Sequence, residues 1–144
     1  MPLRALLDVN VLIALLDSDH LHHQQAVEWL EEGAPHGWAS CPITQNGFIR
    51  ILSNPRYRNP TSTADAIYRL KKAVDGPAHK FWPDSLSLFE TGLVNWEKAL
   101  SCRSLTDAYL LALAVKNNGR LVTFDRGITT DFVNGATAQH LLVL

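Results

Sequence analysis

The sequence is poor in the features that mark secreted and membrane proteins. It has only two cysteines, Cys41 and Cys102, and they follow no metal or redox spacing, so neither a disulfide framework nor a cysteine metal site is expected. Its apolar runs are broken by Asp8, Asn10 and Asp17 before they reach the length of a membrane span, and no signal-peptide pattern stands at the start. We therefore expect a cytoplasmic protein that does not associate with membranes.

An excess of charge of either sign is also missing. The 13 Lys and Arg side chains nearly balance the 14 Asp and Glu side chains, and the formal net charge is -1. The overall field therefore does not attract a polyanion, and any contact with nucleic acid must depend on local sites. What the chain does have is 47% hydrophobic residues, without a composition break or an internal repeat. This predicts one globular domain over residues 1–144.

Strand and helix patterns alternate along the chain. Short aliphatic runs that are typical of buried strands lie at 3–8, 37–43, 79–83, 120–125 and 138–144. Helical periodicity is found between them, at 11–17, 20–33, 44–54, 61–76 and 104–119. This alternation favours an α/β fold in which helices cover both faces of a central, mainly parallel sheet, a three-layer α/β/α sandwich.

Local signals predict where some of these helices begin and which faces they bury. Ser18 and Asp19 are start signals for the second helix, and Thr106 is the expected N-cap of the last. Ile67 belongs to the apolar face of the fourth helix. The last helix carries apolar residues on several faces and is followed by Asn-Asn-Gly, so we expect it to be deeply buried and to end there.

Three aspartates stand where the predicted strands and helices begin or end. Asp8 ends the first strand, Asp125 ends the fourth, and Asp107 opens the helix that leads into the fourth strand. The carboxyl ends of parallel strands line the crevice in which open α/β sheets bind ligands, so Asp8 and Asp125 should meet at one edge. Asp107 joins them if the first turn of its helix reaches the same edge.

Each acid also has a purely structural interpretation. Asp107 beside Thr106 can satisfy helix N-terminal amides, and Asp125 before Arg126 can be a turn residue. Asp8 lies between aliphatic residues, where a buried carboxylate needs partners or a cation. We favour a shared site because three acids at element ends are less expected by chance than any one of them.

A cluster of three carboxylates indicates a metal site. The acids would raise one another's pKa values unless a cation neutralised them, and oxygen ligands without His or Cys favour Mg²⁺ or Mn²⁺ over zinc. Such a metal activates water, orients a phosphate and stabilises charge on the leaving oxygen, which suits phosphodiester hydrolysis. Asn10 and Thr123, each two residues from an acid, are candidates to hold the carboxylates or to contact the scissile phosphate.

The motifs "LLDVNVLIALL", "SLTDAYLLALA" and "LVTFD", in that order, resemble those of the PIN domain, and the compact length resembles the VapC toxins of VapBC toxin-antitoxin modules. The resemblance covers essentially the whole chain and implies a Mg²⁺- or Mn²⁺-dependent endoribonuclease that cuts structured RNA, such as tRNA or rRNA. It also implies a homodimer and a VapB antitoxin whose C-terminal segment occupies the active-site groove. Asp8, Asp107 and Asp125 match the family's first, third and fourth acidic positions. Asn10 and Thr123 match its usual polar companions.

The chain departs from the family pattern at the second acid. Most PIN nucleases have a glutamate in the helix after the second strand, where this chain reads Thr44, Gln45 and Asn46, and no carboxylate occurs between Glu32 and Asp65. The amide of Gln45 or Asn46 can still hydrogen-bond a metal-bound water, although a neutral amide holds a cation less firmly. An alternative is therefore a catalytically weakened PIN module that binds RNA or an antitoxin without efficient cleavage.

Basic and histidine clusters are less specific signals. Arg50, Arg56 and Arg58 form the densest basic group, which either contacts RNA phosphates or an acidic peptide of the antitoxin, or belongs to a solvated loop. Arg126 either touches the RNA backbone or pairs with its neighbour Asp125. The histidines of "HLHH", at positions 20, 22 and 23, are expected on the first turn of a solvated helix and not as metal ligands.

A phosphatase of the haloacid dehalogenase type is another class of enzyme with an aspartate at the end of its first strand. Such a phosphatase needs a second Asp two residues later as general acid, and this chain has Asn10 there. No lysine in a matching helical context precedes Asp125. This interpretation is therefore disfavoured.

Overall fold

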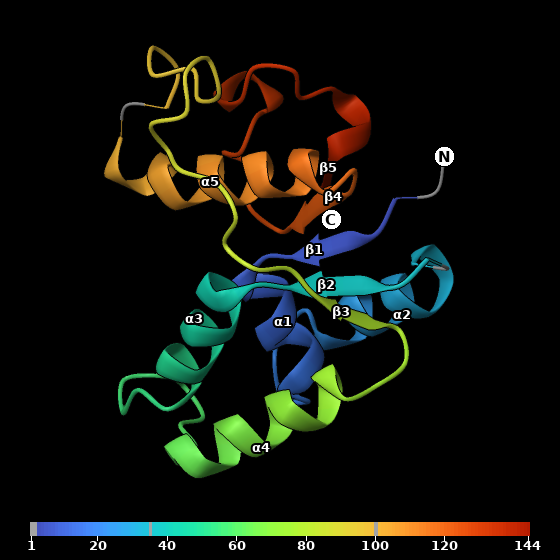
Figure 1. Cartoon of the computed structure of the whole chain (residues 1–144). Coiled ribbons are helices and arrows are strands. Elements are labelled where there is room, and N and C mark those ends of the chain that lie inside the picture. Colours follow the sequence, from blue (N-terminus) through green and yellow to red (C-terminus); the bar gives the residue numbers. More distant parts are fainter. Residues whose placement is uncertain (1–2, 35, 100) are drawn as a thin grey trace.

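Five parallel strands form the centre of the protein, shown in Figure 1 as a computed structural model that describes residues 3–34, 36–99 and 101–144. Their order in the sheet is β3-β2-β1-β4-β5, and every neighbouring pair is parallel. The strands are β1 (Ala5–Leu7), β2 (Trp38–Ser40), β3 (His79–Phe81), β4 (Arg120–Thr123) and β5 (Leu141–Val143). All five predicted strands and the mainly parallel sheet are thereby confirmed.

Helices cover both faces of this sheet. In the described part of the chain they are α1 (Val9–Leu16), α2 (His23–Gly33), α3 (Pro42–Leu52), α4 (Thr63–Val74) and α5 (Cys102–Lys116), with short 3₁₀ turns at Thr130–Phe132 and Ala138–His140. Helices α1 to α4 lie on one side of the sheet and α5 lies on the other, so the predicted three-layer sandwich is confirmed (Figure 1). None of the helices in these described segments is long and apolar enough to span a membrane.

The central strands β1 and β4 supply side chains to both apolar layers, because successive residues of a strand point to opposite faces. Leu6 and Leu121 pack in the cluster with α5, whereas Leu7 and Val122 pack in the cluster with α1, α3 and α4. All three residues of β1 are buried, since strands flank both of its edges and helices cover both of its faces. Burial on both faces explains why this stretch is continuously aliphatic in the sequence.

Helix α5 is buried along most of its length. Every residue from Ala108 to Ala114 is buried, and the cluster around the helix includes Trp82 and Phe132 from the segments that follow β3 and β4. The helix therefore packs on the sheet with one side and beneath these segments with the other (Figure 1). It ends at Lys116, and Asn118, two residues later, has a φ of 53°, a left-handed conformation that Asn tolerates after helix ends. The predicted deep burial and the Asn-Asn-Gly stop are confirmed.

The predicted N-terminus of α5 was wrong. The helix begins at Cys102, and its N-cap is Ser101, whose Oγ accepts a hydrogen bond from the backbone N–H of Ser104 at 3.2 Å. Thr106 lies inside the helix and caps nothing. Ser101 takes the N-cap position because it lies more than one helical turn before Thr106, and its hydroxyl bonds to a backbone N–H that has no partner within the helix. Asp107 is therefore not a first-turn acid, and its interpretation as a helix-capping residue does not hold.

Two other local predictions were also wrong. Helix α2 starts at His23, because the carboxylate of Asp17 accepts the backbone N–H of Asp19 at 3.1 Å and closes a turn where the sequence signals predicted a helix start. Ile67 on α4 is 48% exposed. The buried face of that helix is centred on Ala66 and Leu70, so Ile67 stands at its edge.

Candidate functional site

Asp8 lies at the junction of β1 and α1, at the carboxyl edge of the sheet. Its side chain is only 8% exposed, and its two oxygens have different partners. Oδ1 accepts the backbone N–H of Val9 at 2.8 Å, and Oδ2 accepts the hydroxyl of Thr123 at 2.8 Å. The backbone N–H of Asp8 donates to the carbonyl of Val122 at 2.9 Å, which extends the pairing of β1 with β4. The strand order reverses between β1 and β4, so Asp8 stands at the position where such sheets bind ligands.

The hydroxyl of Thr123 connects Asp8 to the end of β4. It donates to Asp8 and accepts the backbone N–H of Asp125 at 3.0 Å and the side-chain amide of Asn10 at 3.4 Å. The side-chain oxygen of Asn10 accepts the backbone N–H of Phe124 at 3.3 Å. A hydroxyl has one proton to donate and two lone pairs, so all of its bonding capacity is used here. Asn10 and Thr123 thus fix the start of α1 against the end of β4.

Asp125 follows β4 and is exposed. Its Oδ1 accepts the backbone N–H of Gly127 at 2.8 Å, which is the turn role that the sequence allowed. That bond occupies only one of the two carboxylate oxygens. The negative charge of Asp125 raises the pKa values of both Asp8 and Asp107, which shows that it lies within electrostatic reach of the other two acids.

Asp107 comes to the same edge from α5 and is half-buried. Burial, followed by the charges of Asp8 and then Asp125, raises its pKa to about 6. The pKa of Asp8 is also raised, mainly by burial, although the hydrogen bonds from Thr123 and Val9 partly oppose the shift. The structure therefore brings the three predicted acids within electrostatic reach of one another, and the ionised forms of Asp8 and Asp107 are destabilised until a cation offsets the charge.

At the position of the missing second acid, two of the three predicted residues make their hydrogen bonds elsewhere. Thr44 is fully buried, and its hydroxyl accepts the backbone N–H of Cys41 at 3.0 Å and donates back to the carbonyl of Cys41 at 3.1 Å, which caps α3. The amide of Gln45 donates to Ser40 at 2.9 Å, and the hydroxyl of Ser40 lies 2.7 Å from Nε2 of His79. Thr44 and Gln45 thus stabilise the start of α3 and the end of β2.

Asn46 is exposed on α3. The next residue, Gly47, packs so closely on the side chain of Val9, the residue after Asp8, that a methyl group there would lie 2.8 Å from Cγ2 of Val9. The first turns of α3 therefore lie beside the carboxylate edge. Of the three predicted residues, Asn46 is the one whose side chain is exposed at this position.

The predicted basic residues are exposed and lie on different elements. Arg50 is on α3, Arg56 and Arg58 are in the loop 53–62, and Arg126 follows Asp125. Tyr57, which stands between two of these arginines, points inward, and its hydroxyl donates to Oδ2 of the buried Asp17 at 2.5 Å. Among the described residues, Lys71 and Asp75 form the one ion pair with a nitrogen-to-oxygen distance within 4.0 Å. The alternative in which Arg126 pairs with Asp125 is therefore not seen in this structure.

The donor set at the edge suits a hard divalent cation. It consists of the carboxylate oxygens of Asp8, Asp107 and Asp125, a type of ligand that Mg²⁺ and Mn²⁺ prefer. In the part of the chain that the structure describes, no three His, Cys, Asp or Glu side chains stand close enough to enclose one ion as they are.

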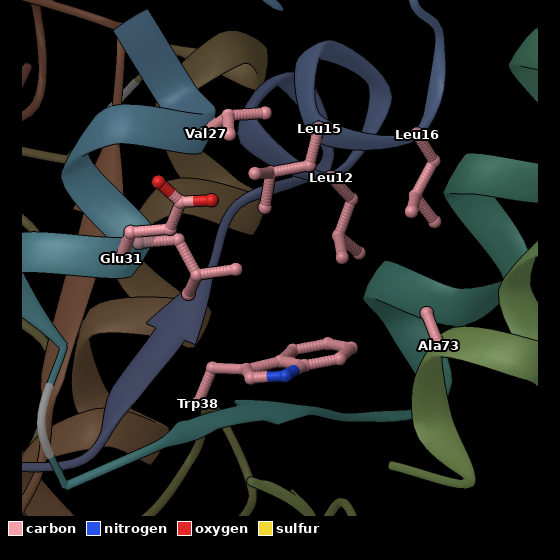
Figure 2. A pocket seen from close by; sticks show the side chains of 8 residues that line it. Leu12, Leu15, Leu16, Val27, Glu31, Trp38 and Ala73 are labelled. Atoms are coloured by element: carbon pink, nitrogen blue, oxygen red, sulfur yellow. The ribbon is translucent and has the colours of Figure 1, made fainter. Parts of the chain in front are cut away.

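A separate cavity of about 310 Å³ lies between α1, α2, β2 and α4 and shares no residue with the carboxylate edge. Figure 2 shows the leucine side chains of α1 facing the indole of Trp38 across it. Its lining is apolar apart from Glu31 and consists of Leu12, Leu15, Leu16, Val27, Leu30, Glu31, Trp38 and Ala73. The cavity lacks the converging polar groups that hydrolysis requires, so the carboxylate edge remains the candidate reaction site.

Sequence reasoning missed an aromatic pair at the end of β4. The ring of His22 stacks on the ring of Phe124, with centroids 5.0 Å apart and an interplanar angle of 26°. Phe124 is flanked by Thr123 and Asp125, so its position in "LVTFD" was a signal that could have placed it at the site. The contribution of His22 had no local signal, because the contact joins segments far apart in the chain.

Comparison with known proteins agrees with this architecture. The model of the PIN domain family matches residues 5–130. Ribonuclease VapC44 of Mycobacterium tuberculosis is 50% identical over 142 residues, which cover 99% of this chain and 100% of that protein.

Two solved structures share the fold. VapBC2 from Rickettsia felis, bound to a DNA fragment of its promoter, superposes with a TM-score of 0.55 at 13% identity and covers 84% of this chain and 87% of that chain. VapC20 of M. tuberculosis, a toxin that cleaves the sarcin-ricin loop, superposes with a TM-score of 0.57 at 14% identity and covers 81% and 85%. At these identities the likeness establishes the fold alone. Together with the family match and the relative at 50% identity, it shows that this chain belongs to the PIN-domain family and, within it, to the VapC ribonucleases.

Proposed function

We propose that this chain is the toxin of a type II toxin-antitoxin module and hydrolyses phosphodiester bonds of structured RNA, such as tRNA or rRNA, at the edge formed by Asp8, Asp107 and Asp125. One observation carries the proposal. The Thr123 hydroxyl bonds to Asp8 and to the backbone of Asp125 at 2.8 and 3.0 Å, and both acids raise the pKa of Asp107. Membership of the VapC ribonucleases supports an endoribonuclease over a module that only binds RNA.

The cofactor in this proposal is Mg²⁺ or Mn²⁺, held by Asp8, Asp107 and Asp125 with water completing the coordination. A bound cation would supply Lewis-acid activation of water and stabilisation of charge on the leaving oxygen. The residues of the chain prepare the site for it. Thr123 orients one oxygen of Asp8, Val9 binds the other, and Asn10 fixes the backbone that carries Asp125. Arg50, Arg56, Arg58, Arg126 and the exposed Asn46 are candidates to contact the RNA or an acidic peptide.

The proposed partners are a VapB-type antitoxin and a second copy of this chain. A solved neighbour of the same fold is VapBC2, a toxin-antitoxin complex. The surface offers large apolar groups for protein contacts, since Phe89 is 87% exposed, and Trp96 and Leu105 are each 41% exposed. The apolar cavity of Figure 2 also has room for side chains of a partner.

Removal of divalent metal is expected to abolish RNA cleavage. With EDTA, the rate on total RNA or on a defined hairpin should fall at least about 100-fold, because charge stabilisation at a single group is worth about that much. Addition of excess Mg²⁺ or Mn²⁺ should restore it, as followed on denaturing gels. Cleavage that continues unchanged in EDTA would contradict the proposed cofactor.

In the metal-free protein, Asp107→Asn is expected to increase stability above pH 6. The pKa of Asp107 is raised from 3.8 to about 6 in the folded state, so its ionisation favours unfolding. The free energy of unfolding of the wild type therefore falls as the pH rises from the unfolded pKa of 3.8 to the folded pKa of about 6. The variant has no such carboxyl group and should lack that fall. Because the side chain is half-exposed and screened by solvent, we expect a gain of only about 1 kcal/mol at neutral pH and above.

Thermal unfolding in EDTA at several pH values measures this difference. The variant should gain about 2–4 °C in Tm at about pH 8 and nothing at about pH 4. Added Mg²⁺ should stabilise the wild type at the higher pH more than the variant. Parallel pH profiles of the two proteins would show that neither burial nor the neighbouring acids raise the pKa of Asp107 in the folded protein.

A further inference from the structure

A row of aromatic rings leads away from the carboxylate edge. Phe124 is half-buried and packs on the apolar cluster with α1, and the exposed His22 stacks on it with centroids 5.0 Å apart. The ring of His20 lies 5.8 Å from that of His22 at an angle of 45°. The rings therefore form a continuous surface that starts in the core and reaches solvent at His22.

This row is attached to the hydrogen bonds that hold the acids. Phe124 is the residue directly before Asp125, so their Cα atoms are about 3.8 Å apart. Its backbone N–H donates to Asn10 at 3.3 Å, and Asn10 also bonds to the Thr123 hydroxyl that holds Asp8. The position of the ring pair is thereby fixed relative to the acids.

The segment that carries the histidines is held in place as well. Asp17 accepts the hydroxyl of Tyr57 at 2.5 Å, and Asp19 accepts the side-chain amide of Asn59 at 2.9 Å. The backbone N–H of His22 donates to Nδ1 of His20 at 3.0 Å. Both long-range bonds join this segment to the loop 53–62, so the rings and the arginines of that loop belong to one connected surface. A ligand that binds to a surface held in this way loses little free energy to ordering it.

The histidines do not form a metal site, since no three His, Cys, Asp or Glu side chains gather around a common point in the described segments. Base stacking suits their position better. Three carboxylates at this edge repel the phosphates of RNA, and the protein has a formal net charge of only -1. Stacking of a base on a ring requires no charge and is insensitive to this repulsion.

We propose that His22 and Phe124 form a platform on which an unpaired base of the RNA substrate stacks beside the scissile phosphate. The inference rests on the proposed ribonuclease function and assigns to two residues of this chain a role in positioning its RNA substrate. A base inside a duplex is already stacked and paired, so it cannot reach the platform without being extruded. The platform therefore selects loops over helices.

The test is RNA binding in EDTA, which separates binding from cleavage. Fluorescence anisotropy would compare a labelled hairpin that has a long unpaired loop with a blunt duplex of the same stem sequence. His22→Ala should weaken binding of the hairpin about tenfold, as expected for the loss of one stacked base, and should leave binding of the duplex unchanged. His22→Phe should restore the affinity, because the platform needs a ring and not a charge. Phe124→Leu, which keeps an apolar side chain but removes the ring, should behave as His22→Ala does.

His36→Ala is the matched control, since His36 is also exposed but precedes β2 at the opposite end of the sheet. It should bind both RNAs as the wild type does. In Mg²⁺, His22→Ala should raise KM about tenfold and change kcat less than about twofold. A general loss of structure would lower kcat as well, so it would not give this pattern. Equal affinity of His22→Ala and wild type for the hairpin, or equal weakening for hairpin and duplex, would overturn the platform.

The same measurements distinguish this failure from failure of the proposed function. If the wild type cleaves the hairpin in Mg²⁺ and His22→Ala cleaves it with an unchanged KM, the platform is wrong and the ribonuclease stands. If hairpin binding depends on His22 but neither Mg²⁺ nor Mn²⁺ produces cleavage, the proposed hydrolysis is wrong and the platform stands.

Discussion

Asp8→Asn is expected to reduce the rate of RNA cleavage at least about 100- to 1,000-fold while the protein stays folded. The carboxylate of Asp8 is 8% exposed and is the most buried of the three acids, so a bound cation would gain most from its charge. Asparagine keeps one oxygen that can accept the hydroxyl of Thr123 at its present position. The second oxygen, which accepts the backbone N–H of Val9, becomes a donor, so that hydrogen bond is lost.

The stability of this variant should change little. Burial raises the pKa of Asp8, which means that its charge destabilises the folded metal-free protein. Loss of that charge offsets the loss of the bond to Val9, whose net value is about 1 kcal/mol. We expect a Tm in EDTA within a few degrees of the wild type, but a much smaller rise in Tm when Mg²⁺ is added.

Single-turnover cleavage and thermal unfolding, with and without Mg²⁺, measure both effects. Asp75→Asn is the matched control, because it removes a carboxylate from an exposed ion pair with Lys71 at the end of α4. Such surface pairs contribute little, so this variant should keep wild-type activity and metal response. Cleavage by Asp8→Asn at the wild-type rate would show that the reaction takes place elsewhere.

The parts of the site that could be predicted from the sequence are those set by the ends of strands. Asp8 and Asp125 end two aliphatic runs, and parallel pairing of those runs carries both acids to one edge. Asp107 was predicted for the wrong reason. It was assigned to the first turn of its helix, whereas α5 begins at Cys102 and brings Asp107 to the edge from inside the helix.

What the sequence did not predict depends on side-chain direction and on contacts between distant segments. Gln45 is one of the three residues that stand where most of the family has its second acid. Its amide nevertheless bonds to Ser40, because the end of β2 offers a hydroxyl within reach. Tyr57 stands in an arginine-rich loop but points to a buried carboxylate. His22 meets Phe124 only after the sheet has assembled. Periodicity reports which face of an element is buried, and it carries no information about such pairings.

Gly119→Ala is expected to be the most destabilising of the substitutions considered, because it acts on the pairing of β1 with β4 that positions the acids. Gly119 is buried between α5 and β4, and its φ is not in the left-handed region. Glycine is required here because a larger side chain would collide with its neighbours, and not because the backbone adopts a conformation that other residues avoid. A methyl group there would lie 2.6 Å from the backbone oxygen of Arg4 and 2.4 Å from Cη2 of Trp82. Trp82 is 3% exposed and has little room to move.

The collision falls on the hydrogen bond that begins the pairing of these strands, in which the backbone N–H of Arg120 donates to the oxygen of Arg4 at 3.0 Å. Relief therefore requires β1 and β4 to separate where their register is set, and we expect a loss of about 3 kcal/mol or more in the free energy of unfolding. For a protein of this size that corresponds to a fall of about 10 °C in Tm. Gly76→Ala, at the end of α4 with its nearest contact at 3.2 Å, should cost less than about 1 kcal/mol. If Gly119→Ala unfolds at the wild-type temperature, the two strands tolerate separation at their start, and the hydrogen bonds around Thr123 alone would have to hold Asp8 beside Asp125.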